Sequence, residues 1–358
     1  MSQRELTVGF LLPSAYNAAS GIWRKSLLQA SELRKIGARA LIFSFTGEGS
    51  DSLADHIHIP LRAGVSKEKQ LGSLVEKMIA AAVDVAYVRR ELWHPAYRTL
   101  MRRIPTIAEI NTLDSAEYRL TMALPRRVYA AVTALFWQQA PAGFVSVTHE
   151  LAKALPPRKP RAIISNGIAE PFNTPASGSA KPHLFFSGTG SYSWHGIDKF
   201  IALARAFPNW DFSIAGEDAA NLGSDTPPHV RCHGKLSSSA ADGLLATANI
   251  GVGTLALHRK NMDEACPLKL RSYLAYGLPS IIAYQDTDFS GKYDFICQIS
   301  NTEKNVVSEK EKIASFVTAN FQRRVAWDEV KFASETEKAR QRYDFFKQIV
   351  ATRAANRA

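Results

Sequence analysis

The chain has 358 residues, enough for two domains at ~100–200 residues each. Hydrophobic residues make up 46% and charged residues 22%, which excludes a disordered tail protein and a membrane bundle. The 44 basic and 33 acidic side chains leave a net charge of +11. This excess favours an anionic partner, either nucleic acid, a nucleotide or a phospholipid surface.

The excess charge is not spread evenly. Residues 1–160 carry 21 basic and 13 acidic side chains, residues 161–332 carry 17 of each, and residues 333–358 carry six and three. A DNA-binding fold could show this asymmetry. So could an enzyme whose first domain faces a membrane while its second handles a small soluble ligand.

Cysteines and the first residues indicate the compartment. Cys232, Cys266 and Cys297 form no Cys-x-x-Cys pair, which favours a reducing compartment and argues against a zinc site. No signal peptide is readable after Met1, so we expect a cytoplasmic protein.

Strands and helices alternate from the start of the chain. Short apolar runs predict strands at 6–12, 40–45, 56–61, 84–89, 105–110, 143–147 and 161–165. Helices are expected at 21–36, 66–82, 95–103, 115–139 and 150–155. This alternation predicts a parallel, doubly wound α/β domain.

A second α/β domain follows a linker. Residues 169–182 are rich in Pro, Ser, Gly and Ala, which is typical of a linker. Strands are then expected at 183–187, 211–215, 230–233, 250–254 and 280–283, with helices at 194–206, 238–248 and 267–276. A basic helix at 335–354 matches the first domain better than the second.

We therefore expect a first domain at 1–168 with a returning helix at 333–358, and a second domain at 183–332. No internal repeat has a clear sequence signature. Two such domains place a cleft between the carboxyl ends of their strands, where α/β sheets bind ligands.

The most informative stretch is residues 264–282, EACPLKLRSYLAYGLPSII. Pro267 suits the first turn of a helix that Gly277 ends. Free N–H groups near Leu268 and the amine of Lys269 would suit a diphosphate. Glu264 could accept hydrogen bonds from hydroxyls of the group that the diphosphate carries. The alternative is that Glu264 is a solvated loop residue and Lys269 a surface lysine.

This stretch resembles the donor-binding signature of GT-B glycosyltransferases, in particular the large retaining family 4. Other pieces follow in the family's order between residue 7 and about residue 290: Ser20-Gly21, Asn166-Gly167-Ile168, Gly188 after its strand, Trp194 to Asp198, 211–216, and His233-Gly234. The order and spacing of these pieces carry the resemblance.

The resemblance implies an α/β protein of GT-B fold, with two Rossmann-like domains facing across a cleft and a C-terminal helix returning to the first. It implies a metal-independent, retaining hexosyltransferase in surface glycan assembly. The enzyme would move sugar from a nucleoside-diphosphate sugar to a lipid-linked or oligosaccharide acceptor, with no further cofactor. Glu264 would be catalytic, and the donor-binding residues would be Gly21, Gly188, Thr189, His195, Lys269, Leu270 and Ser272.

Two departures from the family pattern affect the donor site. The second family glutamate falls on Ser272, and the arginine and lysine of the phosphate loop fall on Thr189 and His195. A hydroxyl accepts more weakly than a carboxylate. Lys269 is the natural substitute for the missing cations, helped by the glycine-loop N–H groups and by Arg259, Lys260 or Arg271. These departures leave retaining and inverting stereochemistry open.

A metal site is not expected. Asp286-Thr287-Asp288 has the Asp-x-Asp spelling, but it follows the strand at 280–283 and the donor helix. We interpret this triplet as a loop or capping element.

Polar residues follow the strand at 105–110 in the first domain. Glu109 or Asp114 could act as a catalytic base, and Asn111 could touch the acceptor. Asp114 with Glu117 also fits a helix N-cap box. His149 is a further acceptor-side candidate, with a structural role as the alternative.

Eight arginines and several aromatic residues lie between residues 89 and 129. No nucleic-acid motif accompanies them, so we expect no nucleic-acid partner. The mixture suits an interfacial patch of Arg102, Arg103, Arg126 and Arg127 on anionic lipid, at the inner face of the plasma membrane. The alternative is a solvated basic face with core aromatic residues.

Two rival functions remain. A nucleotide-sugar epimerase or hydrolase on the same fold would convert donor without any acceptor. A degenerate, non-catalytic sugar-nucleotide binder is the second rival, because Thr189, His195 and Ser272 replace family residues.

Overall fold

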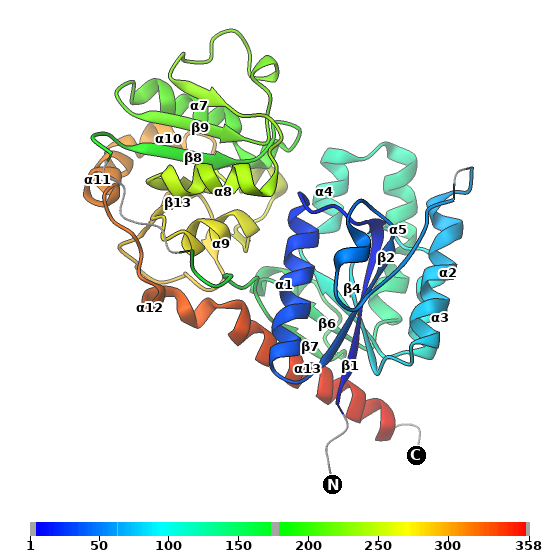
Figure 1. Cartoon of the computed structure of the whole chain (residues 1–358). Coiled ribbons are helices and arrows are strands. Elements are labelled where there is room, and N and C mark those ends of the chain that lie inside the picture. The colour runs from blue at the N-terminus through cyan, green and yellow to red at the C-terminus, as the bar shows by residue number, and fades with distance from the viewer. Residues whose placement is uncertain (1–4, 63, 173–178, 356–358) are drawn as a thin grey trace. The chain divides into compact units, whose positions relative to one another are not determined.

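The computed structural model describes residues 5–62, 64–172 and 179–355 (Figure 1). The chain divides into two compact units. Unit 1 comprises Met1–Ser165 and Glu335–Ala358, and unit 2 comprises Asn166–Ser334. The chain passes from unit 1 to unit 2 after Ser165 and returns to unit 1 at Glu335, within about three residues of the boundaries that the sequence predicts at 168 and 333.

Unit 1 is built on a parallel sheet with the strand order β3-β2-β1-β4-β5-β6-β7. Its strands are β1 (Thr7–Ala15), β2 (Arg39–Phe45), β3 (His56–Ile59), β4 (Val85–Arg89), β5 (Thr106–Ile110), β6 (Gly143–Ser146) and β7 (Arg161–Ile163). The central strands are near-continuous apolar runs, because helices cover both faces of a parallel sheet.

The helices of unit 1 are α1 (Gly21–Lys35), α2 (Lys67–Ala80), α3 (Pro95–Arg103), α4 (Asp114–Thr121), α5 (Leu124–Gln139), α6 (His149–Lys153) and α13 (Glu335–Ala355). The single helix predicted at 115–139 is wrong, since α4 ends at Thr121 and α5 begins at Leu124. Pro125 is in the first turn of α5, where its missing N–H costs nothing, whereas it would break a continuous helix.

The last helix completes the core of unit 1. In α13, Ala339, Phe346 and Ile349 are buried with Phe10 and Trp23 of the first two elements. Figure 1 shows α13, in red, crossing beside the blue strand β1. The predicted return of the C-terminal helix is confirmed within the residues that the structure describes.

Unit 2 repeats this architecture with the strand order β10-β9-β8-β11-β13-β15. Its strands are β8 (His183–Ser187), β9 (Asp211–Ala215), β10 (Val230–Cys232), β11 (Ile250–Val252), β13 (Ser280–Ile282) and β15 (Ile296–Gln298), beside a two-stranded sheet of β12 (Glu264–Ala265) and β14 (Gln285–Asp286). Its helices are α7 (Ile197–Ala206), α8 (Ser238–Thr247), α9 (Leu268–Ala275), α10 (Asn305–Ser308), α11 (Lys310–Asn320) and α12 (Trp327–Val330).

Both sheets therefore have the order of a Rossmann fold, although the sequence shows no repeat. The order reverses between β1 and β4 in unit 1 and between β8 and β11 in unit 2. Ligands of open α/β sheets bind beyond the strand ends at such points. The fold thus directs attention to the residues that follow β8 and β11.

The predicted linker at 169–182 is only partly described, because residues 173–178 lie outside the described residues. Its first part belongs to unit 2. The Phe172 N–H donates to the Ala275 carbonyl at 2.9 Å, and the Phe172 ring stacks on Tyr276 with centroids 4.2 Å apart.

Among the described helices, none is both long and apolar enough to cross a bilayer.

Candidate functional site

Tyr273 fixes the strand ends at the switch point of unit 2. The Ser187 N–H donates to the Tyr273 hydroxyl at 3.0 Å, and this hydroxyl donates to the Val252 carbonyl at 3.1 Å. A Cβ on Gly251 would lie 2.4 Å from the Tyr273 ring, so glycine leaves the space that the ring fills. Helix α9 is thereby held across the ends of β8 and β11.

A short loop after β8 brings His195 and Lys269 together. A Cβ on Gly188 would lie 3.0 Å from His195 Nδ1 and 3.3 Å from Lys269 Nζ. The Thr189 N–H donates to His195 Nδ1 at 3.2 Å, which leaves the ring proton on Nε2 in the neutral tautomer. Burial, with the nearby Lys269 amine, lowers the pKa of His195 to about 2, so the ring is a neutral donor.

Lys269 lies in the first turn of α9 and has an unusual environment. Its Nζ is shielded from solvent, finds no hydrogen-bond partner among the described residues, and lies 4.7 Å over the Phe186 ring. Burial lowers the pKa of Lys269 to about 7. A buried ammonium without an anion is costly, so this position favours an anionic ligand.

The first turn of α9 adds uncapped N–H groups. Pro267 is the N-cap and no side chain caps the helix, so the N–H groups of Leu268, Lys269 and Leu270 have no intrahelical acceptor. The Leu270 side chain is buried, which leaves its N–H as the group that a ligand could bind. Ser272, half-buried, follows Lys269 by one turn of the same helix.

Glu217 occupies the loop that the sequence assigns to phosphate. This buried carboxylate accepts a hydrogen bond from the Gly190 N–H, from Thr189 Oγ1 at 3.0 Å and from Asn221 Nδ2 at 2.6 Å. The bond from Asn221 and those from the loop hold the pKa of Glu217 below its usual range. Glu217 directly follows the strand ending in Ile-Ala-Gly, but no spacing in the sequence indicates this role.

The N–H groups of the loop after β8 are bonded within unit 2, and the expected help from the glycine loop at Ser20-Gly21 stays a prediction. The Gly188 N–H donates to the Ala215 carbonyl at 2.8 Å, that of Thr189 to His195, and that of Gly190 to Glu217. Each of these donors has an acceptor inside the protein. Lys269 and the first turn of α9 are left as the donors for a diphosphate.

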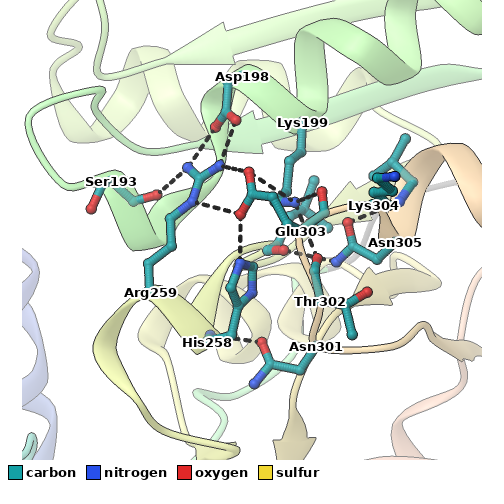
Figure 2. A network of polar contacts seen from close by, with 12 residues as sticks. Ser193, Asp198, Lys199, His258, Arg259, Asn301, Thr302, Glu303, Lys304 and Asn305 are labelled. Carbon is teal, nitrogen blue, oxygen red and sulfur yellow. Dashed lines mark hydrogen bonds and ion pairs between the residues drawn. The ribbon is translucent and has the colours of Figure 1, made fainter.

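The three other basic residues expected to replace the missing cations have partners within the protein, and their role toward a diphosphate stays a prediction. Arg259 binds Asp198 through both carboxylate oxygens, at 2.9 and 2.7 Å, and also binds Glu303 and the Ser193 carbonyl (Figure 2). Arg271 binds the carboxylates of Asp286 and Asp288, and the Lys260 amine lies 4.4 Å over the Trp194 ring. Their charges are already engaged.

The network around Arg259 fixes the loop that carries His195. Figure 2 shows Arg259 and His258 converging on Glu303, with Arg259 also reaching Asp198 at the start of α7. The hydrogen bonds from Arg259 and His258 lower the pKa of Glu303 to about 2. Since Arg259 also donates to the Ser193 carbonyl, this network is a support for the donor loop.

Glu264 is buried in β12, with 8% of its surface exposed, and accepts a hydrogen bond from Thr287 Oγ1 at 3.1 Å. The alternative that Glu264 is a solvated loop residue is wrong, and so is a surface position for the Lys269 amine. The pairing of β12 with β14 fixes the backbone that carries Glu264.

The Asp286-Thr287-Asp288 triplet has a structural role. Asp286 and Asp288 bind Arg271 Nη2 at 2.9 and 2.8 Å, and Asp286 also accepts from the Asp288 and Phe289 N–H groups. Arg271 Nε donates to the Asn166 carbonyl at 2.7 Å. This buried cluster ties α9 to β14 and to the first residue of unit 2.

Glu109 of unit 1 lies inside a polar cluster and is 4% exposed. Lys25 Nζ lies 2.9 Å from its carboxylate, and Tyr87, Gln29 and Asn111 donate to it at 2.7, 3.2 and 2.8 Å. Burial alone would raise the pKa of Glu109, but the charges of Lys25 and Arg342 and the donated hydrogen bonds together outweigh burial and hold the pKa well below the usual range. This geometry favours a positioning role for Glu109, and a catalytic role stays a prediction.

The other unit 1 candidates are spread over different elements. Asp114 is the first residue of α4, and its Oδ2 lies 2.5 Å from Arg90 Nε. Because the N-cap of α4 is Leu113, the predicted cap box of Asp114 with Glu117 is wrong. Gly21 begins α1, and exposed His149 begins α6 after the Thr148 cap. Their roles at donor or acceptor stay predictions.

Three of the four patch arginines are exposed: Arg102, Arg103 and Arg126; Arg127 is half-buried. Apolar side chains beside them on α5 are also exposed: Leu124 65%, Val128 54%, Val132 67%, Leu135 57% and Phe136 48%. These positions recur every three or four residues, so they share one face of α5. Trp93, Tyr97 and Trp137 are buried, which also fits the alternative of a solvated basic face with some aromatic residues in the core.

No family model and no curated protein matches the chain. Among solved structures, the chain is similar to sucrose-phosphate synthase from Thermosynechococcus elongatus, with a TM-score of 0.65 and 13% identity over 97% of this chain and 100% of that one. It is also similar to WaaG, a glycosyltransferase involved in lipopolysaccharide biosynthesis, with a TM-score of 0.60 and 12% identity over 96% and 98%.

A third similar structure is an alpha-glucosyltransferase, AGT, in complex with UDP, with a TM-score of 0.56 and 12% identity over 96% of both chains. These identities are low, while the coverage takes in both units. Together with the two Rossmann-type sheets, the similarity shows that this chain has the GT-B fold of glycosyltransferases.

Proposed function

We propose that the chain is a glycosyltransferase that moves a sugar from a nucleoside-diphosphate sugar to an acceptor hydroxyl. The observation that carries the proposal is the shielded, unpartnered Lys269 amine in the uncapped first turn of α9, at the switch point of unit 2. A diphosphate would supply the missing anion. The complexes of the similar alpha-glucosyltransferase with UDP support a nucleotide donor.

The residues suggest how transfer would proceed. The transition state is oxocarbenium-like, and negative charge grows on the leaving diphosphate as the glycosidic bond breaks. Lys269 and the α9 N–H groups would stabilise this charge. The neutral His195 could donate its Nε2 proton in a hydrogen bond to a donor oxygen, and Glu264 could accept from a sugar hydroxyl. We propose no metal and no further cofactor in this step.

For the acceptor we propose a lipid-linked or oligosaccharide hydroxyl in surface glycan assembly. The basic, partly apolar surface of α5 supports an acceptor at a membrane, and WaaG, of the same fold, is involved in lipopolysaccharide biosynthesis. Stereochemistry follows the family resemblance and is proposed as retaining.

A substitution of Glu264 tests the donor assignment. A thermal-shift screen of UDP-, GDP- and ADP-sugars identifies the donor, and turnover is then measured with and without glycan acceptors. We expect Glu264→Gln to lower kcat about 10- to 100-fold with little change in donor affinity. This is the size of effect expected when a hydrogen bond to a charged group is lost. The exposed neighbour Asp263 gives the control, since Asp263→Asn should behave as the parent.

The rival functions give different results in the same assay. An epimerase or hydrolase consumes the donor equally well without acceptor, and a degenerate binder is stabilised by nucleotide sugar but shows no turnover. If Glu264→Gln and the parent turn over donor alike, the assignment of Glu264 is wrong.

The membrane contact that we propose for Arg102, Arg103, Arg126 and Arg127 predicts salt-dependent binding to vesicles. We expect co-sedimentation with phosphatidylglycerol vesicles at low salt and release at high salt. Arg126→Gln should weaken binding about fivefold, since a basic side chain near an anionic surface contributes about 1 kcal/mol. Arg231, an exposed arginine of unit 2, provides the control substitution. Equal binding to neutral vesicles would contradict this contact.

A further inference from the structure

Unit 1 contains a cavity of ≈ 500 Å³ beyond the ends of β4 and β5, lined by the helices α4, α5 and α6. This volume lies in the range of small-molecule sites, about 300–1,000 Å³. Its walls are largely apolar, with Trp93, Ile110, Leu113, Trp137, Leu151 and Leu155 among the lining residues. The cavity does not involve Lys269 or any other residue of the unit 2 site.

The charged residues that line the cavity are Arg90, Glu91, Asp114 and Arg127. The carboxylates of Glu91 and Asp114 are engaged, by the Tyr97 hydroxyl at 2.5 Å and by Arg90 at 2.5 Å. The Arg127 guanidinium, by contrast, has no ion pair or side-chain hydrogen bond in the part of the chain that the structure describes. A ligand with an anionic group next to an apolar body would complement this arrangement.

A second unpaired group supports a ligand here. Trp137 lines the cavity and is 2% exposed, and its indole Nε1–H has no hydrogen-bond partner among the described residues. Buried indole N–H groups usually have an acceptor. An oxygen of a bound ligand would provide one.

The cavity also continues into the apolar face of α5. Leu124 and Val128 line the cavity and are exposed at the same time, and Val132 and Leu135 extend this face along the helix (α5 is labelled in Figure 1). An alkyl chain could therefore pass from an apolar medium into the cavity along apolar side chains.

We propose that this cavity binds the alkyl chain of an anionic amphiphile, with Arg127 binding its anionic group. This inference deepens the proposed function and rests on it in one respect: the amphiphile is the lipid carrier of the acceptor. A cavity of ≈ 500 Å³ that opens at Leu124 and Val128 has room for one alkyl chain, whereas a partner helix is about 10 Å across and needs a larger groove.

The probe is dodecyl phosphate, kept below its micelle concentration and titrated into the nucleotide-free protein by calorimetry. Because each buried methylene contributes about 0.8 kcal/mol, affinity should rise about fourfold per added carbon from octyl to dodecyl phosphate. A chain carrying bromine at its end should quench tryptophan fluorescence, since Trp93 and Trp137 line the cavity.

Matched variants locate the binding. Ala134→Phe fills the cavity and should weaken dodecyl phosphate binding at least tenfold, with Ala131→Leu as a milder version. Val307→Phe, at an exposed position of α10 in unit 2, should bind as the parent. Arg127→Gln should remove the preference for dodecyl phosphate over dodecanol, and Arg119→Gln, an exposed arginine of α4 outside the lining, should keep it.

Equal binding by the parent and by the folded Ala134 and Ala131 variants overturns the proposal, and so does affinity that is independent of chain length. Binding of vesicles without binding of monomeric dodecyl phosphate also overturns it. The assay contains no nucleotide, so its failure is distinct from a failure of the donor screen. If the cavity binds the alkyl chain while no sugar nucleotide binds to the protein, the proposed binding site is supported and its role in binding the acceptor is overturned.

Discussion

Lys269→Met should make the ligand-free protein more stable while it removes binding of the nucleotide sugar. Burial holds the pKa of Lys269 at about 7, below the ordinary 10.5, so the charged amine destabilises the folded state. Methionine keeps most of the volume without the charge, and we expect a gain of the order of 1–4 kcal/mol at neutral pH. Affinity for the donor should fall about 100-fold or more, because the buried diphosphate loses its cation.

Thermal unfolding and calorimetric titration with UDP-glucose, or with the sugar nucleotide that the screen selects, measure the two effects. Lys260→Met is the matched control: this lysine is also buried beside an aromatic ring, but it has partners, so its loss should lower stability. If the Lys269→Met variant is less stable than the parent and binds the donor normally, Lys269 has a structural role and does not bind the diphosphate.

The pKa of Lys269 also sets a pH dependence. Since the folded-state pKa lies below the unfolded one, the destabilisation is full below about pH 7 and is relieved as pH rises towards 10.5. Donor affinity should be constant below about pH 7 and fall by up to about tenfold per pH unit above it, because the diphosphate selects the protonated amine. A diphosphate diester does not titrate near neutral pH. In Lys269→Met, both dependences should disappear.

Arg271→Met should destabilise unit 2 by about 3–5 kcal/mol, the usual effect of removing one partner from a buried ion pair. Asp286 is fully buried and Asp288 nearly so, and both would lose their cation. Denaturant unfolding of the whole chain measures the loss. The loss of stability should become smaller as pH falls, because burial raises the pKa of Asp286 and its unpaired carboxylate then takes up a proton in the folded state.

An exposed ion pair provides the control for Arg271. Arg205 and Asp225 lie 2.5 Å apart with both side chains largely exposed, so Arg205→Met should change stability by less than about 1 kcal/mol. Adding Asp286→Asn and Asp288→Asn to Arg271→Met should restore part of the loss. An Arg271→Met variant as stable as Arg205→Met would contradict the structural role of this cluster.

The sequence predicts the strands of both sheets well because each is an apolar run bounded by turn residues. The runs at 183–187 and 211–215 are observed with the same bounds as β8 and β9. The same kind of reasoning misses the break before α5, because the apolar pattern continues across Pro125. It also misses the short elements β12, β14, β15, α10 and α12, and the longer helix α11.

At the site, residue types are predicted better than their partners. Lys269 and His195 are brought together as the motif order implies. That Glu217 accepts from Gly190, or that Arg259 and Arg271 are engaged by carboxylates, depends on side chains distant in sequence, and no local pattern encodes such contacts. Of the groups expected to bind an anion, Lys269 and the first turn of α9 are those without a hydrogen-bonding side-chain partner among the described residues.

The position of α13 has a consequence for how the chain is made. Its buried face, with Ala339 and Phe346, completes the core that Phe10 and Trp23 begin. Because α13 follows Ser334, the last residue of unit 2, the ribosome synthesises all of unit 2 before the helix that completes the core of unit 1.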